Sequence, residues 1–253
     1  MNNKTVHINS NIVVLGAGES GVGAALLAKS KGLNVWVSDF GGIKQNFKQE
    51  LIDNAIPFEE NGHSEEKVLH ADIVVKSPGI PEKAPIVQKI RANNIRIISE
   101  IEWASKFTEG TIVGITGSNG KTTTTSLTYH ILNKAGFDVA VAGNIGKSFA
   151  RVVAEKDHQY YVVEISSFQL DDLETFKPHI SVVTNITEDH LDRYNYKFEE
   201  YIAAKLAITT NQDNSDYCIY CQDDVVTNQN IKDISNPTSV SYTHLRAHET
   251  TSH

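Results

Sequence analysis

Short apolar runs alternate along this chain with segments in which apolar residues recur every three or four positions. The runs have the length and β-branched composition of buried strands, and the recurring segments have the period of helices. Runs of the strand type occupy residues 11–15, 34–38, 71–76, 95–98, 111–115, 138–141, 160–163, 180–184 and 217–221. Helical patterns occupy residues 22–31, 83–93, 99–106 and 197–209, and a further one begins after residue 121. This alternation predicts an α/β protein with parallel sheets.

The segment Phe107-Thr108-Glu109-Gly110 interrupts the alternation and has the composition of a linker. At 253 residues the chain is long enough for two domains of common size. We therefore expect a first domain at residues 1–108 and a second at residues 109–238.

A glycine-rich turn follows the first strand. Residues 16–21, here called the first glycine turn, have the pattern G-x-G-x-x-G, and Asp39 ends the next strand at the distance that a dinucleotide-binding fingerprint requires. This predicts a Rossmann-like domain that binds a nucleotide diphosphate, although a nicotinamide dehydrogenase and a turn without a ligand remain alternatives. Ser77-Pro78-Gly79 forms a rigid turn after the strand at 71–76, at the edge where open α/β sheets bind ligands.

A second glycine turn, residues 117–122 (G-S-N-G-K-T), connects the strand at 111–115 to a helical pattern. The first amides of a helix lack intrahelical partners and the helix dipole is positive there, so such a turn binds anions. Lys121 would add a charge on terminal phosphates, and the Thr122 hydroxyl would be a ligand for Mg²⁺. The full phosphate-loop pattern fails because Ile115 occupies the position of its first glycine. An ordinary turn with a solvated lysine is therefore the alternative.

Polar side chains follow the later strands of the second domain. Asn144 lies between two glycines after the strand at 138–141, and Glu164 comes at the tip of the strand at 160–163. An acid at such a tip beside a phosphate loop is the usual second holder of Mg²⁺, although Glu164 could also cap the next helix. The loop at 185–194 contains three acids with His190 and Arg193. We favour a metal ligand for His190 over a solvated side chain.

Lys205 has an unusual place in the helical pattern at 197–209. It falls on the same stripe as Phe198, Tyr201 and Ile202, which faces the core. A lysine that reaches out to solvent from the edge of the stripe is one interpretation. The other is a partly desolvated lysine with a lowered pKa, able to act as a nucleophile or to capture carbon dioxide.

Composition limits the function classes. The net charge of -8 argues against binding to nucleic acid or an anionic membrane, and the apolar content of 40% is that of a globular protein. No apolar run is long enough to span a bilayer, and residues 1–10 lack the apolar core of a signal peptide, so we expect a cytoplasmic monomer without membrane insertion. Cys218 and Cys221 lie in a strand-like run without a second pair, which favours two structural thiols.

The character of the sequence changes near its end. Residues 239–253 contain three of the ten histidines but have no clear period, and His253 comes one residue too late to complete H-E-x-x-H from His248. We assign no metal site there. The segment resembles read-through at the end of a truncated reading frame, and we expect it to be non-native.

Five motifs together resemble the ATP-dependent Mur ligases. They are T-G-S-N-G-K-T-T at 116–123, G-N-I-G at 143–146, E-I-S-S-F-Q-L at 164–170, N-I-T-E-D-H-L-D-R-Y at 185–194 and A-A-K at 203–205. S-S-F-Q-L with T-E-D-H-L-D-R-Y is similar to the branch that joins D-glutamate to UDP-N-acetylmuramoyl-L-alanine. The resemblance extends from about residue 11 to 224 and implies that the first glycine turn holds the UDP of this cell-wall precursor, without nicotinamide.

The resemblance implies a reaction in which ATP phosphorylates the alanyl carboxylate and the D-glutamate amine then displaces phosphate. The catalytic residues would be Lys121, Glu164, His190 and Lys205. Mg²⁺ would be held by Thr122, Glu164, His190 and Lys205, the last as a carbamate. ATP would lie on Gly117, Ser118, Asn119, Gly120, Lys121, Thr122, Thr123 and Thr124. The precursor would contact Gly18, Glu19, Ser20, Asp39, Ser77, Pro78, Gly79, Asn144, Ser166 and His190.

Two departures from the family qualify these expectations. Phe40 and Gly41 follow Asp39 where some relatives have polar or basic residues, which affects the expected uracil and diphosphate contacts. The family also has a third domain, which carries the D-glutamate site and part of the ATP site. We expect this chain to stop before the second domain is complete and to be inactive alone. The remaining alternatives are the sibling ligase that adds L-alanine to UDP-N-acetylmuramate, and a non-catalytic nucleotide-binding module.

Overall fold

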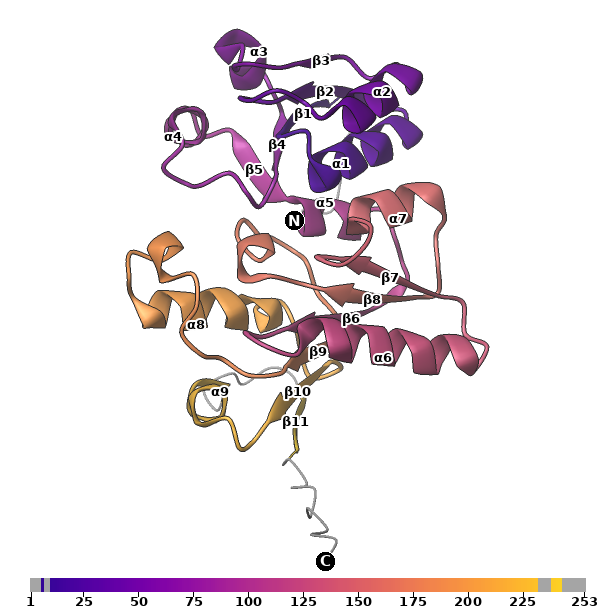
Figure 1. Ribbon diagram of the computed structural model, residues 1–253, viewed down its shortest axis with the longest axis vertical. Coiled ribbons are helices and arrows are strands. Elements are labelled where there is room, and N and C mark those ends of the chain that lie inside the picture. The colour runs from indigo at the N-terminus through magenta and orange to yellow at the C-terminus, as the bar shows by residue number, and fades with distance from the viewer. Residues whose placement is uncertain (1–5, 7–9, 232–237, 243–253) are drawn as a thin grey trace, which may run out of the picture.

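The computed structural model describes residue 6, residues 10–231 and the backbone of residues 238–242. The chain forms two parallel sheets, one above the other in Figure 1. The first sheet is built from residues 11–99 and the second from residues 111–242. The domain boundary at residue 108 stays a prediction. No helix in the described part of the chain is both long and apolar enough to cross a membrane.

The first sheet has the strand order β3-β2-β1-β4-β5, with all neighbours parallel. Its strands are β1 (Asn11–Leu15), β2 (Asn34–Ser38), β3 (Phe58–Glu59), β4 (Ile73–Lys76) and β5 (Arg96–Ser99). Its helices are α1 (Glu19–Ser30), α2 (Gln45–Asp53), α3 (Glu65–Leu69), α4 (Pro85–Ala92) and α5 (Glu100–Ser105). The order reverses direction between β1 and β4, and such a switch point is where ligands bind in this class of fold.

The second sheet has the order β11-β10-β9-β6-β8-β7 and is also parallel throughout. Its strands are β6 (Thr111–Thr116), β7 (Val139–Gly143), β8 (Tyr160–Glu164), β9 (Ile180–Val183), β10 (Tyr217–Cys221) and β11 (Thr238–Tyr242). Its α-helices are α6 (Lys121–Lys134), α7 (Phe149–Glu155), α8 (Phe198–Leu206) and α9 (Val225–Ile231). Short 3-10 turns occupy Ser167–Gln169 (η1), Leu191–Arg193 (η2) and Ala207–Thr209 (η3).

Right-handed crossovers determine which face of the second sheet each helix covers. The chain moves in one direction across the sheet from β6 to β7, and the connecting helix α6 packs on Val113, Ile115, Val139 and Val162. All later connections run the other way, and α7, α8 and α9 belong to the core on the opposite face. Within the described residues, α6 is thus the one helix on its face. Its Leu127 and Ile131 are 56% and 57% exposed, although their spacing suits a core position.

The two units meet where α1 and α5 pack against α7, as Figure 1 shows. Arg151 of α7 donates to Glu19 of α1 at 2.7 Å and pairs with Glu50 of α2. Trp103 of α5 is fully buried and donates its indole N–H to the carbonyl of Ala24 at 3.1 Å. The packing of α1 and α5 on α7, together with the ion pairs from Arg151 of the second unit to two helices of the first, holds the units in one orientation.

A second junction lies along β5 and α5. The buried carboxylate of Glu102 accepts the backbone N–H groups of Glu174, Thr175 and Phe176, at 3.1, 2.9 and 2.6 Å. Asp172, in the same segment, pairs with Lys76 at 3.0 Å. This segment of the second unit is therefore fastened to the first unit at the strand end that carries the Ser77–Gly79 turn.

The structure confirms the expected fold class, with a Rossmann-like first unit and a P-loop-type second unit. The strands at 11–15, 34–38 and 217–221 have the predicted bounds, and Ser99 caps α5 through a bond from Glu102 N. Cys218 and Cys221 are buried thiols that form no disulfide with each other, in line with the expected structural role. The sequence analysis did not assign β3, α2, α3, α7, α9 or β11. Of the expected non-native tail, residues 239–242 extend the second sheet, and residues 243–253 lie outside the described residues.

Gly23 provides a test of the junction between the units. Replacing a helical glycine by alanine usually stabilises a helix by about 1 kcal/mol. A Cβ at Gly23, however, would lie 2.1 Å from Ser148 Oγ and 3.0 Å from Arg151 N, so α7 must shift or lose its cap. We expect Gly23→Ala to lower the free energy of unfolding by about 1–2 kcal/mol in denaturant titrations.

The control is Lys29→Ala, because Lys29 is exposed on the same helix. It should change the free energy of unfolding by less than about 0.5 kcal/mol. A Gly23→Ala protein as stable as the parent would show that the two helices do not pack this closely.

Candidate functional site

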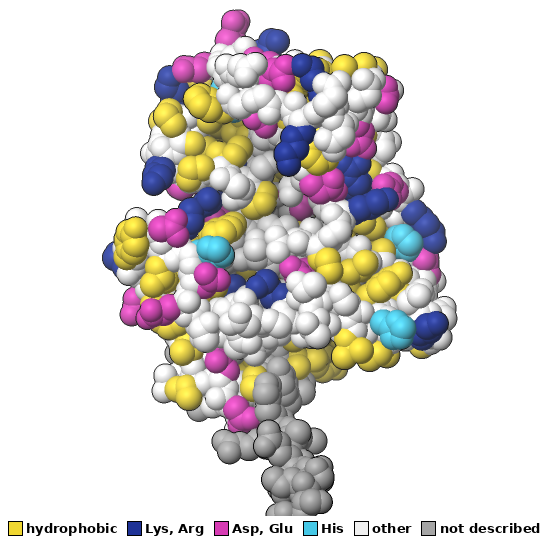
Figure 2. All heavy atoms as spheres, in the orientation of Figure 1, with side chains coloured by type: hydrophobic (Ala, Val, Ile, Leu, Met, Phe, Trp, Pro, Cys, Tyr) yellow, Lys and Arg dark blue, Asp and Glu magenta, His cyan; other side chains and the backbone are white. Residues whose placement is uncertain are grey.

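The side chains expected to carry chemistry gather between the two units. Both glycine turns follow central strands, the first after β1 and the second after β6, at the carboxyl edges of their sheets. A cavity of about 290 Å³, here called the junction cavity, lies between them. Its lining comprises Pro78, Gly79, Lys121, Asn144, Ser166, Ser167, Phe168, Asp189, His190, Arg193, Tyr201 and Lys205. In the space-filling view, Lys and Arg side chains occupy the hollow between the halves of the molecule (Figure 2).

The backbone of the second glycine turn is held by the loop after β9. Gly117 has a φ of +144°, and a Cβ there would lie 1.9 Å from Thr184 Oγ1, so only glycine fits. Ser118 N donates to Asn185 O and Asn119 N to Asn185 Oδ1, at 2.8 and 2.9 Å. Gly120, also with positive φ, is the N-cap of α6. The turn is therefore fixed before any ligand arrives, with the free amides of a long helix behind it.

Two lysines share one acceptor at this turn. Lys121 Nζ donates to Gly117 O at 2.9 Å, and Lys205 Nζ donates to the same oxygen at 2.8 Å. Lys205 is only 2% exposed and its ammonium lies 4.7 Å from the centroid of the Tyr201 ring. Burial, with a contribution from the charge of Lys121, lowers the pKa of Lys205 to about 7. The helical pattern indicated a partly desolvated lysine, and Lys205 is indeed buried beside the second glycine turn.

Glu164 is buried at the end of β8, with one oxygen bonded and one not. Asn144 Nδ2 donates to Oε1 at 2.9 Å, and Asn144 N donates to the Glu164 carbonyl at 2.8 Å. Oε2 has no hydrogen-bond partner among the described residues. A buried carboxylate oxygen without a donor is costly unless a cation or a ligand proton meets it, so this oxygen fits Mg²⁺. No cluster of three or more His, Cys, Asp or Glu able to hold a metal occurs in the described part of the chain.

His190 and Arg193 stand at the mouth of the junction cavity. His190 has a φ of +51° and a side chain that is 58% exposed, with Nε2 3.5 Å from Asp189 Oδ2. The Arg193 guanidinium lies 4.5 Å from the centroid of the Phe168 ring. Phe168 in turn stacks on Tyr194 and contacts the ring of His190. The ring of Phe168 therefore holds the side chains of His190 and Arg193 in place at the mouth of the junction cavity.

A larger cavity, of about 710 Å³, lies at the switch point of the first sheet. Its walls include Gly16, Asp39, Phe40, His63 and residues 79–81 and 83–86. Asp39 Oδ2 accepts Ala17 N at 2.6 Å, so this carboxylate shapes the first glycine turn. Phe40 is well exposed, with its ring 5.8 Å from that of His63, and offers an aromatic surface to a planar base. Gly79 lines both cavities.

Some expected ligands have other partners in the structure. The Glu19 carboxylate accepts Ser148 N and Arg151 Nε, so it points to the junction of the units. The Ser118 hydroxyl bonds Thr187 and Tyr201. Thr122 and Thr123 are exposed on the first turn of α6, and neither lines the junction cavity. Ser77 Oγ is buried under the first glycine turn and has no hydrogen-bond partner among the residues that the structure describes. The roles of these residues toward ligands stay predictions.

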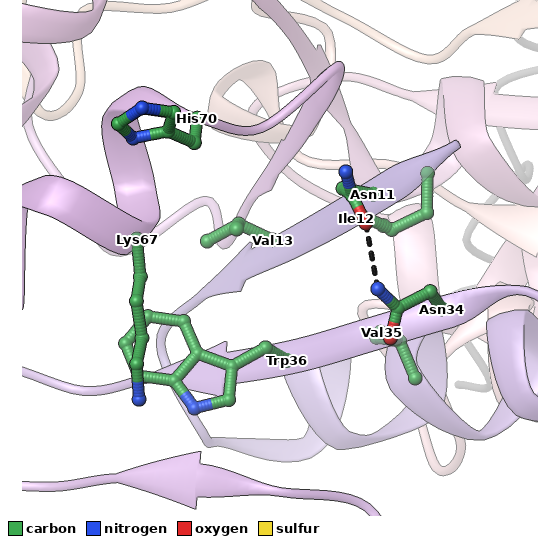
Figure 3. Close-up of a pocket in the computed structure, with 8 residues that line it drawn as sticks. All are labelled: Asn11, Ile12, Val13, Asn34, Val35, Trp36, Lys67 and His70. Carbon is green, nitrogen blue, oxygen red and sulfur yellow. Dashed lines mark hydrogen bonds between the residues drawn. The ribbon is translucent and has the colours of Figure 1, made fainter. Parts of the chain in front are cut away.

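Another pocket, of about 230 Å³, opens at the opposite edge of the first sheet (Figure 3). Asn11 and Asn34, the first residues of β1 and β2, hydrogen-bond to each other at 2.6 Å. Lys67 Nζ lies 4.5 Å from the centroid of the Trp36 ring. The polar groups at this pocket are thus engaged with each other, far from the carboxyl edges where the glycine turns lie.

Sequence reasoning missed Tyr201 and His63 as parts of the two cavities, and gave Arg193 no role of its own. Arg193 belongs to a motif that the analysis singled out, but its spacing could not show which unit it contacts. Tyr201 was assigned to the core-facing stripe of its helix, where it is indeed buried. His63 follows the two-residue strand β3, which is too short to leave a periodic signal.

Comparison with known proteins agrees with this arrangement. Residues 10–99 match the sequence model of the MurD-like Mur ligase N-terminal domain. Residues 115–252 match that of the Mur ligase middle domain, and this match includes most of the segment 239–253, whose origin stays a prediction. A solved structure of UDP-N-acetylmuramate:L-alanyl-gamma-D-glutamyl-meso-diaminopimelate ligase from Neisseria meningitides has a TM-score of 0.65 at 19% identity, covering 92% of this chain and 78% of that one. This likeness shows the shared fold.

Curated relatives are closer in sequence. A UDP-N-acetylmuramoylalanine--D-glutamate ligase from Porphyromonas gingivalis is 56% identical over 214 residues, which are 85% of this chain and 48% of the relative. One from Christiangramia forsetii is 52% identical over 217 residues, or 86% of this chain and 49% of the relative. The chain spans about half the length of these relatives. Because the middle-domain match alone covers more than half of the chain, this protein belongs to the Mur ligase family.

Proposed function

We propose that this chain supplies the precursor and ATP sites of a ligase that joins D-glutamate to UDP-N-acetylmuramoyl-L-alanine. The observation that carries the proposal is the junction cavity, because it places Pro78 and Gly79 of the first unit in one space with Lys121 and Lys205 of the second. A nucleotide diphosphate on the first glycine turn would then extend its acyl end toward the phosphate loop. The names of the curated relatives agree with this substrate pair.

The chemistry would be phosphorylation of the alanyl carboxylate, followed by attack of the D-glutamate amine and loss of phosphate. Phosphoryl transfer depends on positioning and on neutralising charge. Lys121 and the amides at the start of α6 would hold the ATP phosphates. Mg²⁺, when bound, would shield the phosphate oxygens, with Thr122, Glu164, His190 and Lys205 as its proposed holders. The D-glutamate site would lie in the part of the relatives that this chain does not span.

Lys205 would serve as a carbamate. A pKa of about 7 leaves much of the amine neutral near neutral pH, and a neutral amine adds carbon dioxide with release of one proton. The product is an anion, which would replace the repulsion between Lys205 and Lys121 by attraction and could bind a metal. We also propose that the enzyme is cytoplasmic and monomeric.

Binding to each glycine turn can be measured separately. We expect the 253-residue chain to bind both UDP and Mg-ATP in isothermal titration calorimetry. Lys121→Ala should weaken Mg-ATP binding at least about tenfold and change UDP binding by less than about twofold, because it removes a charged donor from one site only. Lys134→Ala, at the far end of the same helix, is the control and should change neither. Loss of UDP binding in Lys121→Ala would argue against two separate sites.

Catalysis should require more than this chain. We expect no dipeptidyl product from residues 1–253 with both substrates and Mg-ATP, in an assay that follows the product by mass spectrometry. A P. gingivalis ligase preparation serves as the positive control. Product formed by the 253-residue chain would refute the need for a further domain.

The lowered pKa of Lys205 predicts how stability depends on pH. The unfolded lysine keeps its proton to about pH 10, so between pH 7 and pH 10 the unfolded state binds more protons and stability rises with pH. Lys205→Met removes this dependence. We compare the free energies of unfolding of the Lys205→Met variant and the parent in buffer free of metal and carbon dioxide. The value for the variant minus that for the parent should fall by about 1 kcal/mol per pH unit from pH 7.5 to pH 9.5. For the exposed-lysine control, Lys134→Met, the difference in free energy of unfolding from the parent should not change with pH. A difference for Lys205→Met that is also independent of pH would contradict the lowered pKa.

A further inference from the structure

Arg193 connects the second unit to the first at the junction cavity. It ends η2, in the loop between β9 and α8, and its Nη2 donates to Pro78 O at 3.2 Å while its Nη1 donates to Gly79 O at 3.4 Å. The guanidinium also lies over the face of Phe168. Both acceptors belong to the turn after β4, so a single side chain of the ATP-binding unit holds the backbone of the precursor-binding unit.

The turn that Arg193 holds is shared by both cavities. Gly79 lines the large cavity at the first glycine turn and also the junction cavity. A ligand that passes from one cavity into the other must therefore run along this turn. The Pro78 carbonyl and the Gly79 N–H belong to one peptide group, and a cation on the carbonyl strengthens the N–H as a donor to an anion. Arg193 thus fixes the position of the Pro78–Gly79 peptide group and also makes its N–H a stronger hydrogen-bond donor.

The charge around the junction cavity suits an anionic ligand. Lys121 and Arg193 line it, and Asp189 is the acid among its described lining residues. Other contacts between the units, such as those of Arg151, Glu102 and Arg91, involve side chains that do not line the junction cavity. Among the described residues, Arg193 is thus a cross-unit contact that also lines the site.

We propose that Arg193 is a positioning residue for ligands that span both cavities. It fixes the Pro78–Gly79 turn relative to the phosphate loop, so that a nucleoside diphosphate with an extended acyl-sugar arm meets both units in register. A nucleotide confined to one cavity does not need this alignment. This role rests on the proposed function, in which Arg193 sets the distance between the precursor site and the ATP site.

Calorimetry with two ligands on the 253-residue chain tests this role. UDP occupies the first cavity alone, whereas UDP-N-acetylmuramoyl-L-alanine reaches into the second. We expect Arg193→Ala to weaken the longer ligand about tenfold, the usual effect of losing bonds from a charged donor, and to change UDP and Mg-ADP by less than about twofold. Arg193→Lys keeps the charge but not the paired donors, and should weaken the longer ligand about threefold.

Arg91→Ala is the matched control, because Arg91 also crosses between the units, through Asp172, but does not line the junction cavity. It should affect both ligands alike, within about twofold. Unchanged binding of the longer ligand to Arg193→Ala, or an equal loss for UDP, would overturn the positioning role. If the alanine variant fails to fold, the lysine variant decides between the same outcomes. A parent chain that binds neither ligand would instead refute the proposed function, and the role of Arg193 with it.

Discussion

Two ammonium groups, those of Lys121 and Lys205, donate to a single carbonyl oxygen, that of Gly117. Burial and mutual repulsion make this arrangement costly, as the lowered pKa of Lys205 shows. Two contacts keep the two ammonium groups together. Gly117 packs closely against Thr184 at the end of β9, and α8 carries Lys205 on its buried side. Such a concentration of positive charge in a protein with a net charge of -8 is a site prepared for anions.

Because the two units have a fixed orientation, the carboxyl edge of the first sheet lies opposite the two lysines of the second unit. Helices α1 and α5 pack on α7, and Glu102 receives three amides from the segment at 174–176, so both sheets turn their carboxyl edges toward one space. In the proposed reaction, this orientation would hold a precursor on the first unit close to a nucleotide on the second. The Pro78–Gly79 turn, held by Arg193, lies where the two ligands would meet.

Sequence periodicity predicted the strands well because parallel strands are buried on both faces and appear as continuous apolar runs. It also placed Lys205 on a buried stripe, since the helical period alone decides which side a residue faces. The same period suits Leu127 and Ile131 to a core position, yet both are exposed on α6, the one helix that the described residues place on its face of the sheet. Contacts between distant segments, such as Glu19 with Arg151 or Arg193 with Pro78, leave no periodic trace and required the structure.

The central claim is that one continuous space joins the precursor site to the phosphate loop. A crystal structure of the chain with UDP-N-acetylmuramoyl-L-alanine and Mg-ADP tests it most directly. The account predicts the diphosphate at the first glycine turn, the sugar along Pro78 and Gly79, and the alanyl carboxylate beside Lys205 and the ADP phosphates. A precursor bound with its alanyl end directed away from the junction cavity would contradict it.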